Sequence, residues 1–320
     1  MSKILELNPS TLTRFCQSQN LIPSHSQNTS KRNARFSIED TRKILGNYIS
    51  SKIGVDKKIL SFYNFKGGTG KTSLCFQVSS FLALCGFKVL VVDADPQGHL
   101  SSSVRIDPTE SNLTLFDGVI HKISVDNIIK NVFDGLDCIP SNLSLTRLET
   151  SLSNLPRREE QIKFYLEGLK KEYDYIIFDT NPNISHLNRN ILTFSDLLCI
   201  VCETQPYSIL GMQLLMDDLD DFFNRMKLDK PDILVIPNKY EDRMSSSLEA
   251  MTVLKKNWGD FLMKDFAVRK AEDFPKSARD KMPFGFFCRT NSIALEDVRD
   301  VVKHIIALTK IENVKLKINV

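Results

Sequence analysis

The chain has 320 residues, of which 42% are apolar and 25% are charged, enough for one large domain plus a small extension. No apolar run approaches the length of a membrane-spanning helix, and the first residues lack the apolar segment of a secretory signal, which predicts a cytoplasmic protein with no membrane partner. Seven cysteines, an odd number, are expected to remain reduced thiols.

The net charge of +3 is unevenly distributed. Residues 1–58 hold ten Lys and Arg against four Asp and Glu, residues 251–320 hold fourteen against nine, and the middle of the chain is therefore acidic. Although charge runs are most often solvated surfaces, basic ends around an acidic centre favour a polyanionic partner, most simply DNA.

Residues 1–56 are predicted to form a small, mainly helical, basic extension. A short helix opens at residues 10–15 and ends before Pro23, and a polar stretch follows. A second segment starts at Ser37 with Asp40 three residues later, which resembles a helix capping box, and residues 46–58 are interpreted as the connection to the next domain.

The order of these segments is similar to the recognition helix and wing of MerR-like winged helix-turn-helix domains. The residues that carry the similarity are Leu21-Ile22-Pro23 and the run Arg35-Phe36-Ser37-Ile38-Glu39-Asp40. Two interpretations stay open for this extension: it binds an operator sequence, or it is a packing or dimerisation arm.

Residues 65–73, Phe-Lys-Gly-Gly-Thr-Gly-Lys-Thr-Ser, have the composition and setting of a phosphate-binding loop. They follow the apolar run 59–64, typical of a buried strand, and they lead into residues 71–85, whose apolar positions recur at helical spacing. Glycines let backbone N–H groups approach phosphate oxygens, and the helix N-terminus adds positive potential. In such a loop Lys71 reaches the β- and γ-phosphates and Thr72 ligates Mg²⁺.

Two later apolar runs end in carboxylates. Residues 88–92 lead to Asp93 and Asp95, and residues 173–178 lead to Asp179. A strand that stops at acidic residues places them at its carboxyl end, which is where open α/β sheets bind ligands. These side chains are therefore expected beside the phosphate-binding loop.

Further strands are predicted at residues 136–141, 195–203 and 232–237, the last ending at Asn238, and a closing helix at residues 292–308. Strand patterns that alternate with helical patterns predict an α/β fold. We expect a doubly wound, mostly parallel sheet of the P-loop NTPase type with helices on both faces and the nucleotide at the strand carboxyl ends, preceded by the small, mainly helical extension. The predicted domains are residues 1–56 and 57–320.

The run Lys66-Gly67-Gly68-Thr69-Gly70-Lys71-Thr72 resembles the deviant Walker A motif of the ParA/MinD branch of P-loop ATPases. Asp93-Ala94-Asp95-Pro96-Gln97, the strand ending at Asp179 and the strand ending at Asn238 extend the resemblance in the family's order, over about residues 57 to 308. It implies an ATPase that uses ATP and Mg²⁺ and acts as an ATP-dependent homodimer.

The resemblance also implies roles for single residues. Lys66 would cross the dimer interface to the phosphates of the other subunit, Asp95 would orient the attacking water, and Asn238 would contact adenine. The expected nucleotide-binding residues are Lys66, Gly67, Gly68, Thr69, Gly70, Lys71, Thr72, Ser73 and Asn238; those at the metal are Thr72, Asp93 and Asp179, and those in catalysis are Lys66, Lys71 and Asp95.

The sequence departs from the family in the loop after Asp179, at Phe65, where a polar residue is common, and mildly at Thr69, where valine is frequent. Thr180-Asn181-Pro182-Asn183 stands where a double proline usually follows the Walker B aspartate, so the shape of that loop is open. Residues 314–320 alternate apolar and polar side chains, which is strand periodicity and argues against the membrane-binding helix of MinD proteins.

The function that the resemblance favours is DNA partitioning of a plasmid or chromosome. An ATP-bound dimer would bind duplex DNA without sequence preference and associate with the nucleoid, and a ParB-like centromere-binding protein would stimulate hydrolysis and release. The candidate DNA contacts are Lys276, Arg279, Lys281 and Arg289.

Three other function classes remain open. A ParA-like ATPase can position a protein cargo, and an ATPase fold can serve as the ATP sensor of a DNA-binding repressor of its own operon. An iron–sulfur carrier of the related branch would need paired cysteines near its C-terminal interface, where the sequence has Cys288 alone.

Overall fold

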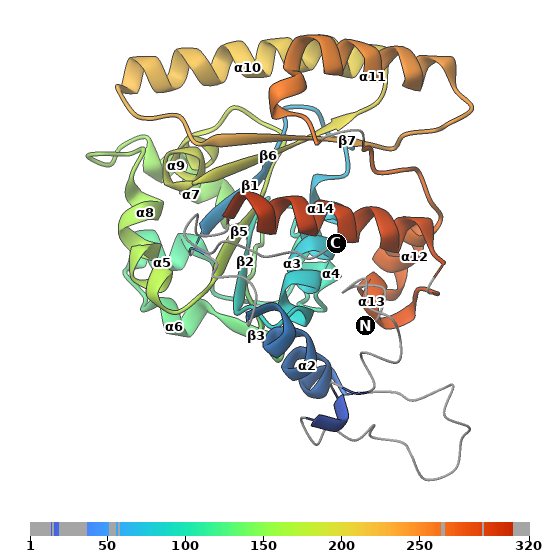
Figure 1. The fold of residues 1–320 in the computed structure, drawn as a ribbon. Coiled ribbons are helices and arrows are strands. Elements are labelled where there is room, and N and C mark those ends of the chain that lie inside the picture. The colour runs from blue at the N-terminus through green and yellow to red at the C-terminus, as the bar shows by residue number, and fades with distance from the viewer. Residues whose placement is uncertain are drawn as a thin grey trace.

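A computed structural model gives the fold, and it describes residues 14, 16–18, 37–50, 56, 58–263, 266–289 and 291–309 (Figure 1). The described chain forms one twisted sheet with helices on both faces, as predicted. The strands are β1 (Lys58–Tyr63), β2 (Val89–Ala94), β3 (Lys130–Phe133), β4 (Leu136–Ile139), β5 (Tyr175–Thr180), β6 (Leu197–Glu203) and β7 (Asp232–Asn238).

The strand order in the sheet is β3-β4-β2-β5-β1-β6-β7. Every neighbouring pair is parallel except β3 and β4, which form an antiparallel edge. Because β1 lies between β5 and β6, the loop that follows it opens at the centre of the carboxyl edge of the sheet. The doubly wound, mostly parallel sheet of the P-loop type is thus confirmed.

Side chains alternate between the two faces of each strand, and this alternation builds the core. In β1, Leu60 and Phe62 pack toward α3 (Lys71–Leu84) and α14 (Ile293–Thr309). On the opposite face Ile59 joins one cluster and Tyr63 another. The helices of that face are α5 (Leu115–His121), α7 (Leu145–Leu152), α8 (Gln161–Leu166), α9 (His186–Phe194), α10 (Pro206–Met226) and α11 (Ser245–Trp258).

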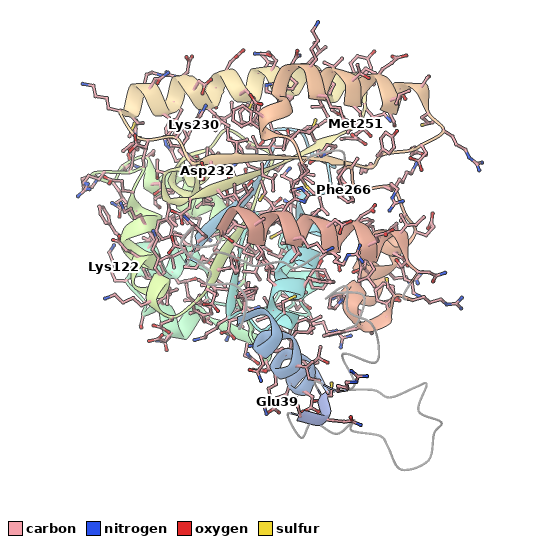
Figure 2. The ribbon with its side chains drawn as sticks, viewed as in Figure 1. Glu39, Lys122, Lys230, Asp232, Met251 and Phe266 are labelled. Atoms are coloured by element: carbon pink, nitrogen blue, oxygen red, sulfur yellow. The ribbon has the colours of Figure 1, made fainter. Side chains whose placement is uncertain are left out.

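Figure 2 shows side chains filling the space between α10, α11 and the sheet, where Met251 of α11 is buried. The remaining elements are short and lie at the sheet edges and loops. They are α4 (His99–Ser103), α6 (Val125–Ile128), η2 (Glu167–Lys171), η3 (Gly259–Phe261), α12 (Asp273–Asp280) and α13 (Phe284–Phe287). Among the described residues, no helix combines the length and apolar character that a membrane span requires.

The N-terminal extension contributes α2 (Ile38–Ser50), and Ser37 caps it by accepting a hydrogen bond from the backbone N–H of Asp40 at 2.9 Å. The prediction that residues 46–58 form a connection is wrong for residues 46–50, which complete this helix. Burial of Ile44 and Leu45 explains the longer helix, because tertiary packing adds to weak local preference.

Arg42 fixes α2 to the α/β domain. Its Nη1 donates to the backbone oxygens of Ala83 (2.7 Å) and Phe87 (3.1 Å), and its Nε pairs with Asp134 at 2.9 Å. Carbonyls at a helix C-terminus lack partners within the helix, so a cation there satisfies them. Residues 19–36 and 310–320, which contain most of the proposed winged-helix segment and the tail with strand periodicity, lie outside the described residues.

Candidate functional site

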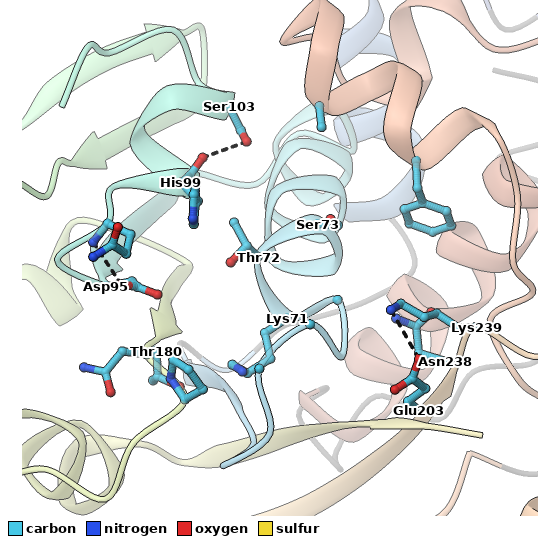
Figure 3. A pocket seen from close by; sticks show the side chains of 18 of the residues that line it. Lys71, Thr72, Ser73, Asp95, His99, Ser103, Thr180, Glu203, Asn238 and Lys239 are labelled. Atoms are coloured by element: carbon cyan, nitrogen blue, oxygen red, sulfur yellow. Dashed lines mark hydrogen bonds and ion pairs between the residues drawn. The ribbon is translucent and has the colours of Figure 1, made fainter. Parts of the chain in front are cut away.

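A pocket of about 1570 Å³ opens at the carboxyl edge of the sheet (Figure 3). The segments that follow β1, β2, β5, β6 and β7 line it, together with residues 269–278 from the start of α12 and the loop before it. Of the predicted site residues, those that line the pocket are Gly67, Gly68, Gly70, Lys71, Thr72, Ser73, Asp95 and Asn238, whereas Lys66, Thr69, Asp93 and Asp179 lie outside its lining.

The phosphate-binding loop depends on glycine where it enters α3. Gly70 is the N-cap of α3 with φ +96°, a left-handed conformation that L side chains rarely adopt. A Cβ at this position would lie 2.3 Å from Nδ2 of Asn238. The end of β7 therefore approaches the loop so closely that only glycine fits between them.

Lys71 is a buried cation at the head of α3. Only 6% of it is exposed, and its Nζ donates to the backbone oxygen of Lys66 at 3.1 Å. Burial lowers the pKa of Lys71, an effect that the carboxylates of Asp179 and Asp95 oppose. A buried ammonium at the N-terminus of a helix matches the phosphates of a nucleotide.

Lys66 does not itself line the pocket, but its ammonium group binds Glu203, which does. Its Nζ pairs with Oε2 of Glu203 at 2.9 Å and donates to Oγ of Ser208, on the first turn of α10, at 2.8 Å. Burial alone would raise the pKa of Glu203, but the hydrogen bond from Lys66 and the charge of Lys239 lower it below its ordinary value. Lys66 is thus held by the carboxyl end of β6 and not by its own phosphate-binding loop.

Asp179, at the end of β5, is fully buried, and neither of its carboxylate oxygens has a hydrogen-bond partner among the described residues. Burial and the charge of Asp93 raise the pKa of Asp179 well above its ordinary value, although the nearby hydroxyl of Thr72, which does not meet hydrogen-bond geometry, and the charge of Lys71 oppose the rise. Unpaired carboxylate oxygens close to Thr72 fit a hydrated Mg²⁺, because this cation prefers oxygen ligands and keeps several of its waters. The donor set thus suits the metal that the sequence predicts.

Asp93, at the end of β2, is also fully buried, but its oxygens are occupied. Oδ2 accepts from the backbone N–H of Ser101 at 2.7 Å and from its hydroxyl at 2.6 Å, while Oδ1 accepts from the backbone N–H of Asp95 at 3.1 Å. Burial raises the pKa of Asp93 to about 6 despite these bonds. In this arrangement Asp93 shapes the turn that carries Asp95.

Asp95 faces the pocket from the end of β2. Its Oδ1 accepts from the backbone N–H of Gln97 at 2.9 Å, which leaves Oδ2 toward the cavity with His99 close by on α4 (Figure 3). A carboxylate acceptor beside a phosphate-binding loop is able to align a water molecule for attack on a phosphoryl group.

Asn238 braces the phosphate-binding loop from β7. Its Nδ2 donates to the backbone oxygen of Thr69 at 2.7 Å, and the side chain is nearly buried. The residue still lines the pocket, so its amide connects the loop with the space beside it. The bracing contact was not predicted from the sequence, because it joins residues 169 positions apart.

The four candidate DNA contacts lie together near the pocket. Lys276 and Arg279 are exposed on α12, Lys281 is exposed at its C-cap with φ +49°, and Arg289 is exposed after α13. Arg279 pairs with Asp280 at 2.9 Å, and Lys276 covers the ring of Phe287 at 4.9 Å. The basic segment thus borders the nucleotide pocket, because Phe274, Pro275 and Ala278 of α12 line it.

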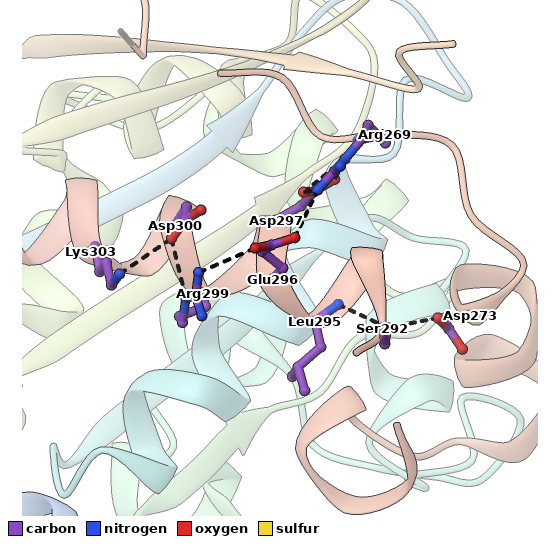
Figure 4. Close-up of polar contacts among 9 residues, drawn as sticks. All are labelled: Arg269, Asp273, Ser292, Leu295, Glu296, Asp297, Arg299, Asp300 and Lys303. Carbon is purple, nitrogen blue, oxygen red and sulfur yellow. Dashed lines mark hydrogen bonds and ion pairs between the residues drawn. The ribbon is translucent and has the colours of Figure 1, made fainter. Parts of the chain in front are cut away.

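Ion pairs fasten this side of the pocket to α14 (Figure 4). Arg269 donates from its backbone N–H at 2.7 Å and from its guanidinium to the fully buried carboxylate of Asp297. Asp273 of α12 accepts from the hydroxyl of Ser292 at 2.8 Å, just before α14 begins. These partners carry no local signal, because each joins distant segments of the chain.

The sequence did, however, contain one usable signal for Glu203. It ends the apolar run 195–203 just as Asp93 and Asp179 end theirs, so the same rule places it at the carboxyl edge. Ser101 and Ser208 do not end an apolar run, so this rule does not locate them. Only the fold brings Ser101 to Asp93 and Ser208 to Lys66.

Comparisons with known proteins agree with this geometry. A family model described as AAA domain matches residues 57–231. The chain is 26% identical over 250 residues to the chromosome partitioning protein ParA of Caulobacter vibrioides, covering 77% of this chain and 94% of that protein. It is also 26% identical over 246 residues to the cell division protein PomZ of Myxococcus xanthus, with 77% and 76% covered.

Among solved structures, a putative plasmid partition protein from Borrelia burgdorferi B31 bound to AMPPNP has the same fold. The two superpose with a TM-score of 0.65 at 24% identity, over 78% of this chain and 98% of that one. Fold, phosphate-binding loop and family match thus coincide over the same residues. The chain belongs to the ParA family of P-loop ATPases, enzymes that hydrolyse ATP with Mg²⁺.

Proposed function

We propose that this protein is a DNA-partitioning ATPase whose ATP-bound dimer binds DNA. The observation that carries the proposal is the position of Lys66, a cation of the phosphate-binding loop whose ammonium group binds Glu203 and Ser208 and which does not itself line the pocket. A lysine so placed is available to the phosphates of a second copy, as the family resemblance implies.

Within one subunit, the geometry supports a role for each residue. We propose that Lys71 and the backbone N–H groups of residues 67–73 hold the phosphates and that Asn238, which lines the pocket, contacts the base. Thr72 and, through water, Asp179 would hold Mg²⁺, which supplies charge neutralisation on the phosphates. Asp95 orients the attacking water.

An apolar stripe on α10 supports the dimer. Tyr207, Leu210 and Leu214 are 85%, 69% and 67% exposed, and their spacing places them on one face of the helix. Exposed apolar side chains that gather in one place mark interaction surfaces. The stripe begins next to Ser208, which holds Lys66, so a second copy that covers it would also meet that lysine.

The basic segment 276–289 supports contact with DNA. Two of its four cations, Lys276 and Arg279, lie on α12, and Phe274, Pro275 and Ala278 of the same helix line the pocket, so a change at the nucleotide is able to reach them. Contacts to phosphates alone give binding without sequence preference that weakens steeply with salt. ATP hydrolysis by the protein alone would be slow. A ParB-like protein would complete the active site, speed hydrolysis and so release the protein from the nucleoid. We also propose that residues 1–56 are a separate N-terminal domain, which either binds an operator or serves as a packing or dimerisation arm.

The test is binding to random-sequence duplex DNA without nucleotide, with ADP and with ATP. The intact protein is compared with Lys66→Ala, Lys71→Ala and Lys230→Ala, the last an exposed-edge lysine that pairs with Asp220 far from the pocket. We expect binding that requires ATP, is lost in the first two variants and is kept in the third. Binding that ignores nucleotide and survives both changes would contradict the proposal and place the DNA contact elsewhere.

A protein cargo is the second candidate, because one relative with 26% identity is a cell division protein. In that case the ATP-bound protein would dimerise without binding DNA.

The third candidate is a repressor that only senses ATP. It would be contradicted if the intact protein hydrolyses ATP and the Asp95→Ala variant does not.

A further inference from the structure

Asparagine side chains tie the loop after β5, residues 180–183, to helix α9. The Nδ2 group of Asn188 donates to the backbone oxygen of Asn181 at 3.0 Å, to Oδ1 of Asn181 at 3.1 Å and to the backbone oxygen of Asn183 at 2.6 Å. The Oδ1 atom of Asn181 also accepts from the backbone N–H of Asn183 at 3.1 Å. We call this set of contacts the asparagine clasp.

The surroundings of Asn188 determine which end of its amide faces the loop. The side chain is fully buried, and three oxygen atoms surround one nitrogen. Only the amino end of the amide is able to donate to them, since a second oxygen there would be repelled and would leave buried acceptors unpaired. The clasp therefore requires a hydrogen-bond donor at position 188.

The clasp reaches the catalytic edge of the sheet through Asn181. Its Nδ2 donates to the backbone oxygen of Ala94 at 3.4 Å, and Ala94 lies between Asp93 and Asp95. Asn181 lines the pocket together with Asp95. The contacts thus span from α9 across the end of β5 to the end of β2.

Helix α9 is a firm support for the clasp. Ser185 caps it by accepting from the backbone N–H of Asn188 at 3.1 Å, and the carboxylate of Glu149 accepts from the first two backbone N–H groups of the helix at 2.6 and 2.9 Å. Arg189 donates from Nη2 to both carboxylate oxygens of Asp218 at 2.7 Å and so joins α9 to α10. Because the helix is held at its start and along its side, the backbone that carries Asn188 is fixed in position.

We propose that Asn188 is a positioning residue for ATP hydrolysis. Through the clasp it holds the 180–183 loop against the end of β2, and so fixes the backbone from which Asp95 faces the nucleotide. The phosphates are held by a different segment, residues 66–73. Loss of the clasp is therefore expected to slow the chemical step and to leave ATP binding nearly unchanged. The proposal rests on the role given to Asp95 in the proposed function.

The test compares Asn188→Ala with Asn190→Ala in the full chain. Asn190 is an equally buried asparagine two positions along α9, but its Nδ2 donates to the backbone oxygens of Arg158 and His186, away from the pocket. Steady-state ATP hydrolysis, binding of a fluorescent ATP analogue and the melting temperature are measured for both. We expect kcat to fall about tenfold in Asn188→Ala with an unchanged KM, since misplacement by an ångström is able to cost up to about a hundredfold.

In Asn190→Ala, a lower melting temperature with kcat close to that of the intact protein is expected. Equal losses of kcat in the two variants, or a raised KM with unchanged kcat in Asn188→Ala, would overturn the proposal and assign Asn188 to folding alone. If Asn188→Ala does not fold, Asn181→Ala replaces it, because that change removes Oδ1 of the clasp and the donor to Ala94.

A further variant, Asn188→Asp, separates positioning from simple loss of volume. Aspartate has the shape of asparagine, so a packing role predicts that it is milder than alanine. The clasp predicts the opposite order, with hydrolysis slower in Asn188→Asp than in Asn188→Ala, because a carboxylate would face three oxygens. An inactive intact protein, or activity independent of Asp95, would instead contradict the proposed function, so the two failures are distinguishable.

Discussion

At the scale of single residues, burial disfavours the charged forms of Asp93 and Asp179 in the nucleotide-free protein. Burial raises the pKa of both, and for Asp93 to about 6. A carboxyl whose pKa is higher in the folded than in the unfolded chain keeps its proton where the unfolded chain has lost it. Folding stability must therefore fall as pH rises between the ordinary value near 4 and about 6.

This argument predicts a pH effect that depends on Asp179. Without nucleotide, the melting temperature of the intact protein should fall between about pH 4 and about pH 6. In Asp179→Asn the fall should be smaller, because one of the two buried charges is gone. Asp221→Asn, on the exposed side of α10, is the control and should keep the full effect. Identical pH profiles for all three proteins would refute the assignment.

The sequence predicted the residues of the site better than their contacts. Lys71, Thr72 and Asp95 line the pocket as expected, because glycine spacing and strand ends are local features. The end of an apolar run indicates where Glu203 lies, but not that it pairs with Lys66, 137 positions away, and nothing local indicates Ser208, which lies 142 positions from Lys66. Asn188 and Asn181 are close in sequence, but their contact depends on the turn between them.

At the scale of elements, apolar runs located the strands because each is buried on both faces. The predicted runs 59–64 and 232–237 correspond to β1 and β7 within one residue at each end. By contrast β3 was not predicted, because this four-residue edge strand is partly exposed and lacks an apolar run. The end of α2 was missed for a related reason, since packing against the domain and not local sequence extends it.

The docking of α2 gives a prediction for that element. Arg42→Ala removes two hydrogen bonds to carbonyls at the end of α3 and the ion pair with Asp134, so we expect unfolding to require about 2 kcal/mol less free energy. Lys43→Ala removes an exposed pair with Glu39 one position along the helix and should leave urea unfolding unchanged. Equal behaviour of the two variants would show that α2 is not held by Arg42.

At the scale of the whole molecule, the pocket borders two further features: the start of α10, which carries the stripe of Tyr207, Leu210 and Leu214, and α12, which begins the basic segment 276–289. The sequence suggested the basic segment through charge alone, but not that α12 lines the pocket. The pocket-lining residues Phe274, Pro275 and Ala278 share α12 with the cations Lys276 and Arg279. In the proposed function, nucleotide binding and DNA binding would therefore share one short helix, which would give a direct physical path between them.

The dimer provides the decisive prediction at this scale. In Leu210→Asp, a charge stands in the middle of the α10 stripe, and burying it against a second copy would be costly. We expect this variant to bind ATP normally but to remain a monomer when light scattering is measured with a non-hydrolysable ATP analogue. Leu228→Asp, at an apolar position 42% exposed beyond the other end of α10, should dimerise like the intact protein. The stripe adjoins the Ser208 hydroxyl that holds Lys66, so a dimer that brings Lys66 to the second subunit should cover the stripe. Dimerisation of Leu210→Asp would therefore mean that Lys66 reaches the second subunit through another surface.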